Sequence, residues 1–223
     1  MVAIGVERVT LRNMMMRRHG WWALVLALVV VGMPGRANSA SSKAVFLEEL
    51  VKAALGRTDS LVVYDGRYRT LAYPGGDVPA GQGVCTDVVV RVYRAVGVDL
   101  QVLVHEDMRR SFEAYPKKWG LRRPDSNIDH RRVPNLQRFF ERHGEVLKRS
   151  EVPEDYNPGD LVTWDVAREK GELPHIGVVV NRLAPGGKRW MVVHNIGAGP
   201  KLEDSLFRFP VTGHYRFVPK ALH

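Results

Sequence analysis

This chain of 223 residues has one cysteine, no internal repeat and, after residue 40, no block of five or more like charges. A disulfide framework needs paired cysteines, and zinc-ribbon and iron–sulfur sites need several thiolates, so the sequence excludes all three. Low-complexity segments are also missing, and 45% of the residues are hydrophobic, which excludes a disordered polyelectrolyte. We therefore expect one compact domain plus an extension, with no metal ion and no cofactor.

The formal net charge of +9 is unevenly distributed along the chain. Residues 1–40 hold five of the 33 basic residues and one acid, which leaves 28 basic against 23 acidic residues in the remainder. The resulting charge of +5 is typical of a solvated basic face, and attraction to an anionic substrate or polymer is the alternative. No nucleic-acid partner is predicted.

The first 40 residues have the pattern of a secretory signal peptide. Two arginines precede an apolar run over 21–33, and a proline and a series of small residues follow it. The run of thirteen residues is shorter than the roughly 20 that a transmembrane helix needs, so no stable membrane insertion is expected after leader removal. We expect cleavage between about residues 37 and 42, a mature domain over 41–223, and a periplasmic or secreted location.

The order of the expected elements indicates an α+β fold. Apolar side chains at helical spacing predict helices over 44–55, 85–96, 107–114 and about 134–147. Strand-like runs, many of them β-branched or aromatic and separated by turn signals, lie at 61–65, 161–166, 175–181, 189–195 and 214–218. Helices followed by hairpin-connected strands predict a C-terminal antiparallel sheet packed on the helix that begins at Cys85.

Cys85 lies at the start of a predicted helix, directly after a glycine- and proline-rich loop over 73–83. A lone cysteine in an exported protein is either buried and inert or retained because it reacts. The first N–H groups of a helix lack intrahelical partners, and the helix dipole favours an anion there. Beside a cationic neighbour, such a thiol can have its pKa lowered from about 8.5 to roughly 3.5–7.5. Cys85 is therefore the candidate nucleophile.

Two histidines are candidates for that neighbour. We expect the hairpin turn to pair Asn181 with Lys188. Antiparallel pairing in this register puts His175 directly opposite His194, whereas Asn195 points to the other face and is the weaker orienting residue. We expect His175 to act as base and later as acid, and His194 to orient its imidazole. The alternative is that both are ordinary strand-end histidines.

Four segments resemble the motifs of the NlpC-type cysteine peptidases, which are papain-like enzymes of the bacterial cell wall. In chain order they are YPGGDVPAGQGVCTD, NPGDLVTW, HIGVVV and VVHN. Within that superfamily, the chain looks most like an exported bacterial branch described only as a domain of unknown function. The resemblance implies a papain-like α+β fold, with N-terminal helices and the nucleophile helix packed on the antiparallel sheet, in a single domain over 41–223.

The same resemblance implies hydrolysis of an amide bond in peptidoglycan stem peptides, often from γ-D-glutamate to a diamino acid, or in related cell-envelope amides. The reaction would proceed through an acyl-enzyme on Cys85. Tyr73 matches the family's tyrosine that assists the oxyanion together with the Cys85 N–H. An acyltransferase would use the same triad, and a non-catalytic cell-wall-binding module would use the same cleft. Peptidoglycan or another envelope peptide is the expected partner.

The chain also departs from the family's pattern. Val84 precedes the cysteine and Thr86 follows it, where the family commonly has aspartate before and serine after. Ninety residues separate Cys85 from His175, more than in a minimal domain of this type, so residues 98–150 are expected to form an elaborated wall.

This elaborated segment supplies four candidate substrate contacts, His105, Asp107, Asp129 and His130. Pairs of histidines and acids also bind metals, but these have no regular i, i+4 spacing. We therefore favour a loop-anchoring or substrate-contact role over a metal site. His214, in the last predicted strand, is expected to be structural.

Overall fold

The computed structural model describes residues 35–167 and 171–220, with side chains from residue 41 onward. The predicted signal peptide, residues 1–40, thus lies outside the residues whose side chains are described. In the described ranges, no helix is both long and apolar enough to cross a membrane.

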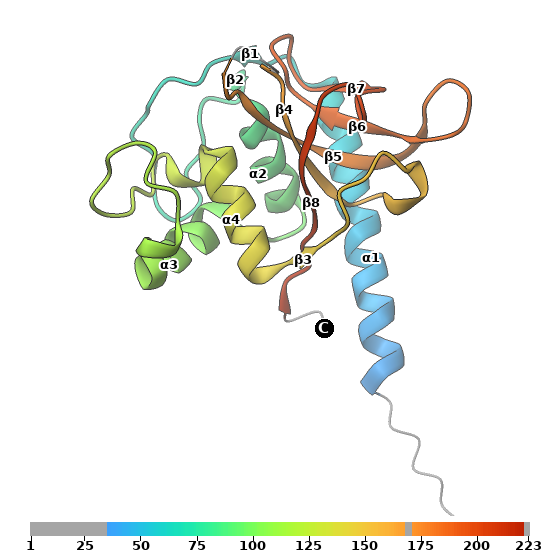
Figure 1. The fold of residues 1–223 in the computed structure, drawn as a ribbon. Helices are drawn as coiled ribbons and strands as arrows, with labels where there is room; N and C mark the ends of the chain where they lie inside the picture. The colour runs from blue at the N-terminus through green and yellow to red at the C-terminus, as the bar shows by residue number, and fades with distance from the viewer. Residues whose placement is uncertain (1–34, 168–170, 221–223) are drawn as a thin grey trace, which may run out of the picture. The chain divides into compact units, whose positions relative to one another are not determined.

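The described helices precede the main strands along the chain (Figure 1). The α-helices are α1 (Gly35–Gly56), α2 (Cys85–Ala95), α3 (Leu100–Ser111) and α4 (Val133–His143), and the 3-10 helices are η1 (Arg57–Asp59), η2 (Phe112–Ala114), η3 (Asp129–Arg131) and η4 (Pro153–Asp155). The strands are β1 (Val63–Tyr64), β2 (Gln82–Gly83), β3 (Glu145–Val146), β4 (Leu161–Asp165), β5 (Pro174–Leu183), β6 (Trp190–His194), β7 (Lys201–Glu203) and β8 (Val211–Arg216). The α+β prediction is therefore confirmed.

Several helix boundaries differ from the sequence prediction. Helix α1 begins at Gly35 rather than at residue 44, and α3 ends at Ser111 rather than at residue 114. Helix α3 begins seven residues earlier than 107, because the Asp99 carboxylate caps it by accepting the N–H of Gln101 at 3.0 Å. Helix α4 ends at His143 rather than near 147, because Gly144 is extended (φ −107°, ψ −169°). The residues that follow Gly144 then pair with β8 as the short strand β3.

The main sheet has six strands in the order β3-β8-β4-β5-β6-β7, and all of its neighbouring strands are antiparallel. Helices α1 and α2 pack on β5, and α4 packs on β5 and β8, so these helices contact the middle of the sheet (Figure 1). The prediction of an antiparallel sheet packed on the cysteine helix is confirmed.

Side-chain alternation gives the sheet two apolar faces. The face toward the helices carries Leu161, Ile176, Val178, Val193 and Tyr215, which join the larger core. The opposite face carries Val162, Trp164, Val179 and Val192, and it is covered by Tyr156 and Leu206. The candidate histidines belong to this second face, because His175 alternates with Ile176 and His194 alternates with Val193.

Candidate active site

Cys85 is the first residue of α2, as predicted, and its side chain lines a cleft of about 360 Å³. Val84 before it is extended, and its N–H donates to the Asp87 carboxylate at 2.7 Å, which caps the helix. Tyr64, Trp119 and Pro174 are among the other residues that line this cleft. The residue as a whole is only 4% exposed, so the sulfur lies at the bottom of the cleft rather than on an open surface.

The expectation of a depressed thiol pKa is wrong for this state of the protein. Burial raises the pKa of Cys85 to about 11, although the backbone N–H groups of Ile176 and Thr86 favour the thiolate and lower it. The helix end does supply donors, as expected, but desolvation of the charged form outweighs them. Cys85 is therefore a neutral thiol at neutral pH.

His175 and His194 form a buried pair in which Nε2 of His175 lies 2.8 Å from Nδ1 of His194. Both are at most 2% exposed, and both rings lie near the indole of Trp164, with centroids about 6 Å away. Burial, and then the repulsion that a protonated His194 would exert, lower the pKa of His175 to about 3. The predicted pairing of the two imidazoles is confirmed, but His175 is neutral rather than an imidazolium.

The register that brings them together differs from the predicted one by two residues. Val178 pairs with Val193 and Val179 with Val192, so His194 lies opposite Gly177. The pairing then shifts between Val179 and Leu183, an irregularity that the sequence pattern does not reveal. A shift of two residues keeps the same face of the strand, so the imidazoles still meet as diagonal neighbours.

The second nitrogen of His194 determines which nitrogens of the pair carry protons. Nε2 of His194 lies 2.9 Å from the Glu203 carboxylate and 3.1 Å from the Ser205 hydroxyl. A carboxylate only accepts, so Nε2 of His194 donates and Nδ1 of that neutral ring accepts. His175 must then donate from Nε2, which leaves its Nδ1 as the basic nitrogen. Glu203 was not among the predicted site residues.

The structure places Tyr64, not Tyr73, against the cysteine. The pKa of Tyr64 is raised by burial, by repulsion from a Cys85 thiolate and by a hydrogen bond to that sulfur. Tyr64 comes there because β1 pairs in parallel with β2 and sets it opposite Gly83, two residues before Cys85. The hydroxyl of Tyr73 instead donates to Glu106 at 3.0 Å. The strand-like run at 61–65 was the signal for Tyr64, but its pairing partner was not predictable.

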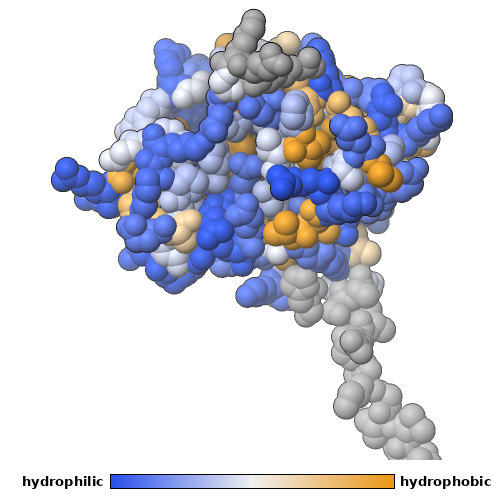
Figure 2. All heavy atoms as spheres, in the orientation of Figure 1, coloured by the Kyte–Doolittle hydropathy of each residue, from blue (hydrophilic) through white to orange (hydrophobic). Residues whose placement is uncertain are grey.

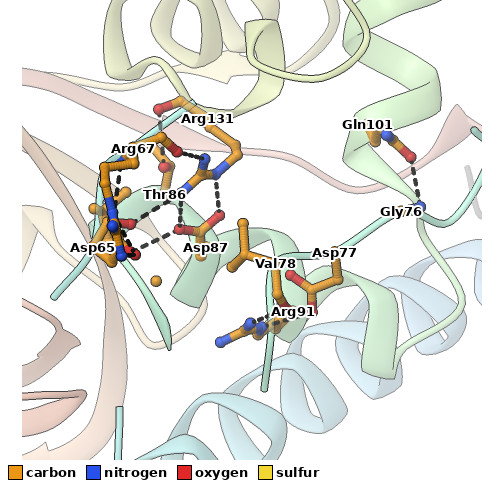
Figure 3. A network of polar contacts seen from close by, with 12 residues as sticks. Asp65, Arg67, Gly76, Asp77, Val78, Thr86, Asp87, Arg91, Gln101 and Arg131 are labelled. Atoms are coloured by element: carbon orange, nitrogen blue, oxygen red, sulfur yellow. Dashed lines mark hydrogen bonds and ion pairs between the residues drawn. The ribbon is translucent and has the colours of Figure 1, made fainter. Parts of the chain in front are cut away.

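A buried ion pair fixes the start of α2, the helix that begins at Cys85 (Figure 3). Nε and Nη2 of Arg131 donate to the two Asp87 oxygens at 2.8 and 3.0 Å, and the two side chains are 1% and 3% exposed. Arg131 also donates to the carbonyls of Asp65 and Arg67, and its own carbonyl accepts the Thr86 hydroxyl at 3.1 Å. The segment between α3 and α4 is thereby tied to the residues that follow Cys85.

Three of the four candidate contacts in 98–150 lie in the interior. Asp107 accepts from Tyr115 and Arg142, and Nε2 of His143 lies 2.9 Å from it, so it joins α3 to α4. Asp129 and His130 are 1% and 2% exposed within η3, and burial lowers the pKa of His130 to about 4.

The fourth, His105, borders open space, in a groove separate from the cysteine cleft. In the part of the chain that the structure describes, no group of three or more histidines, cysteines or acids is placed to hold a metal ion. His214 bonds Asp160 and the Lys148 carbonyl inside the protein, consistent with a structural residue.

Fold and site thus define an α+β protein with a buried cysteine at a helix start and a histidine pair on the adjoining sheet. The chain belongs to the family described as "Domain of unknown function (DUF1287)", whose model matches residues 51–217. It is 53% identical over 161 residues to the uncharacterized protein YijF of Escherichia coli (strain K12), covering 72% of this chain and 77% of that one.

Among solved structures, the chain is similar to NlpC1 from Trichomonas vaginalis, with 15% identity and a TM-score of 0.41. That match covers 77% of this chain and 44% of the other, so the chain spans less than half the length of NlpC1.

Proposed function

We propose that this protein is a papain-like, NlpC-type cysteine hydrolase that is exported and cleaves an amide bond in peptidoglycan stem peptides or related cell-envelope amides. One observation carries the proposal. The His175–His194–Glu203 series leaves a basic nitrogen on His175, and the Cys85 sulfur accepts a hydrogen bond from the N–H of the next residue, Ile176. The Cys85 sulfur therefore lies at the start of β5, the strand that carries His175, and the proposal takes His175 as its base.

The reaction begins from a neutral pair rather than from a thiolate and an imidazolium. As the Cys85 sulfur bonds to the amide carbonyl carbon, its proton passes to Nδ1 of His175. The imidazolium then gives this proton to the leaving nitrogen as the C–N bond breaks, which leaves a thioester on Cys85. Water, deprotonated by His175, attacks the thioester and restores the thiol. His194 and Glu203 hold the His175 tautomer that this sequence of transfers requires.

Tyr64 takes the role that the sequence resemblance implied for Tyr73. Its hydroxyl and the Cys85 N–H are the donors available to the developing oxyanion, because both lie at the cysteine. The Tyr73 hydroxyl is already engaged with Glu106 on α3.

The test is digestion of purified sacculi, with the released fragments weighed by mass spectrometry. Wild-type protein should release peptide fragments and Cys85→Ser should release none. Tyr64→Phe should lower kcat by about 10²–10³, the typical cost of one oxyanion donor, whereas the matched variant Tyr73→Phe should keep kcat within about twofold. Unchanged sacculi with the wild-type protein would refute the assignment to peptidoglycan.

A non-catalytic envelope-binding module is the second candidate, and the raised pKa of Cys85 favours it. Such a protein would bind a muropeptide without forming a thioester. Mass spectrometry of the intact protein after a brief incubation with substrate separates the two, because only the hydrolase, or an acyltransferase with the same residues, gains the mass of an acyl group on Cys85.

A further inference from the structure

A second hollow lies between α3 and the residues that follow η2, and it is larger than the cysteine cleft. This groove has a volume of about 820 Å³ and is lined by the segment 120–127, by Tyr68 and by His105 and Arg109 of α3. The face of the molecule in Figure 2 is largely hydrophilic, with small separate apolar patches. We refer to this hollow, which is lined mostly by polar and charged residues, as the arginine groove.

Three guanidinium groups line the arginine groove against one carboxylate. Arg122 and Arg123 are exposed, and no carboxylate of the described residues forms an ion pair with either. Arg109 bonds Glu106 at 3.2 Å, outside the groove lining. The one carboxylate, Asp125, is held internally by Asn127 and Tyr68. Arg122 and Arg123 therefore give the groove positive charge that no ion pair among the described residues neutralises.

His105 provides a second and independent indication of a ligand. Its Nδ1 atom is buried and has no hydrogen-bond partner among the described residues. Burial also lowers the pKa of His105, so the ring is held in its neutral form. Buried polar atoms in folded proteins are nearly always paired, so this unpaired nitrogen, on a ring that lines the groove, would gain a partner if the ring turned toward a bound polar ligand.

The arginine groove adjoins the cysteine cleft along the chain. Lys118 and Trp119 line the cleft, and the next residues, 120–123, line the groove. One continuous segment therefore forms a wall of both hollows. In the proposal below, a chain-like ligand follows this segment from the groove to the cleft that contains Cys85.

We propose that the arginine groove binds the free carboxylates of an acidic peptide substrate while its scissile amide lies in the cysteine cleft. This inference rests on the proposed hydrolase function for the position of the amide, but the binding that it predicts does not require catalysis. Arg122 and Arg123 pair with the carboxylates as planar, multiply hydrogen-bonding cations, and His105 lines the same groove as a neutral ring.

The probe is the tripeptide L-alanyl-γ-D-glutamyl-diaminopimelic acid, compared with the same peptide in which the carboxylates are amidated. Binding is measured by calorimetric titration of the full chain carrying Cys85→Ala, so that turnover does not interfere. The groove variant Arg122→Gln/Arg123→Gln is made in this background. The matched control, Arg182→Gln/Lys188→Gln, removes the same charge from the β5–β6 hairpin.

The groove variant should raise the Kd of the acidic peptide at least tenfold, and the control should leave it within about twofold. The amidated peptide should bind at least tenfold more weakly than the acidic one to the unaltered groove, and the groove variant should weaken it little further. Equal binding of the two peptides, equal binding to the groove variant, or no binding of the acidic peptide would each overturn the proposal.

Failure of the groove and failure of the hydrolase give different results. If the protein with Cys85 intact hydrolyses the peptide at a KM that the groove variant does not change, the groove proposal is wrong and the hydrolase proposal stands. If the groove variant weakens binding but the protein with Cys85 intact hydrolyses nothing, the hydrolase proposal is wrong and the groove proposal stands. Both arginines are exposed, so their replacement does not threaten the fold.

Discussion

The ion pair between Asp87 and Arg131 offers the sharpest test of how the candidate site is held in place. Asp87→Asn keeps the volume of the side chain and an oxygen that can cap α2, but it removes the charge. Arg131, only 1% exposed, then retains a buried positive charge without a counter-ion. Removing one partner of such a pair typically costs about 3–5 kcal/mol of unfolding free energy, because the remaining charge stays desolvated.

The costs of the two single substitutions in unfolding free energy should be strongly non-additive. Arg131→Met should also cost about 3–5 kcal/mol, because it leaves the Asp87 carboxylate with little more than the Val84 N–H at 2.7 Å. The double variant Asp87→Asn/Arg131→Met buries no unpaired charge, so its cost should be at least about 2 kcal/mol less than the sum of the single costs.

The assay is urea unfolding at pH 7 followed by tryptophan fluorescence, with the free energy taken by linear extrapolation. Glu49→Gln is the control, because Glu49 pairs with Lys52 at 3.6 Å on an exposed surface of α1. It should change the unfolding free energy by less than about 0.5 kcal/mol. Single variants that cost under about 1 kcal/mol, or a double variant that equals their sum, would refute this account of the ion pair.

Two further predictions concern the cysteine and the histidine pair. The rate of Cys85 alkylation by iodoacetamide should rise about tenfold per pH unit from pH 7 and level off only near the pKa of about 11, because only the thiolate reacts; a plateau below pH 8 would contradict the neutral thiol. Gly177→Ala would place a Cβ 2.7 Å from Val192 Cγ1 and 3.1 Å from His194 Cβ. It should cost about 1–3 kcal/mol in the same unfolding assay and lower hydrolysis, whereas Gly56→Ala, which meets no atom within 4 Å, should do neither.

Periodicity and chain order predicted the fold well because they depend on local patterns. The start of α2 at Cys85 and the run of antiparallel strands follow from where apolar residues repeat and where glycines and prolines interrupt them. The His175–His194 contact was also predictable, although the assumed register was two residues off. The contact was predicted despite this error, because a register shift by an even number of residues leaves each side chain on the same face of the strand.

Properties that depend on the environment of a residue were not predictable in the same way. The helix end at Cys85 indicated a lowered thiol pKa. The pKa is raised instead, because segments distant along the chain pack over the sulfur and desolvate it. Tyr73 was predicted because it matches the tyrosine of the family that the sequence resembles. The parallel pairing of β1 with β2, which brings Tyr64 to Cys85, has no sequence pattern in strands of two residues.

The elaborated segment 98–150 performs two tasks that meet in one short helix. Its η3 supplies Arg131, which fixes the first turn of α2 through Asp87. The same η3 supplies Asp129, whose carboxylate accepts the N–H of Asp125 in the wall of the arginine groove. A ligand in the groove would therefore contact a segment that is bonded to the element that holds the start of α2. Because this element contacts both places, the segment that recognises the substrate in our proposal is also the one that positions the nucleophile.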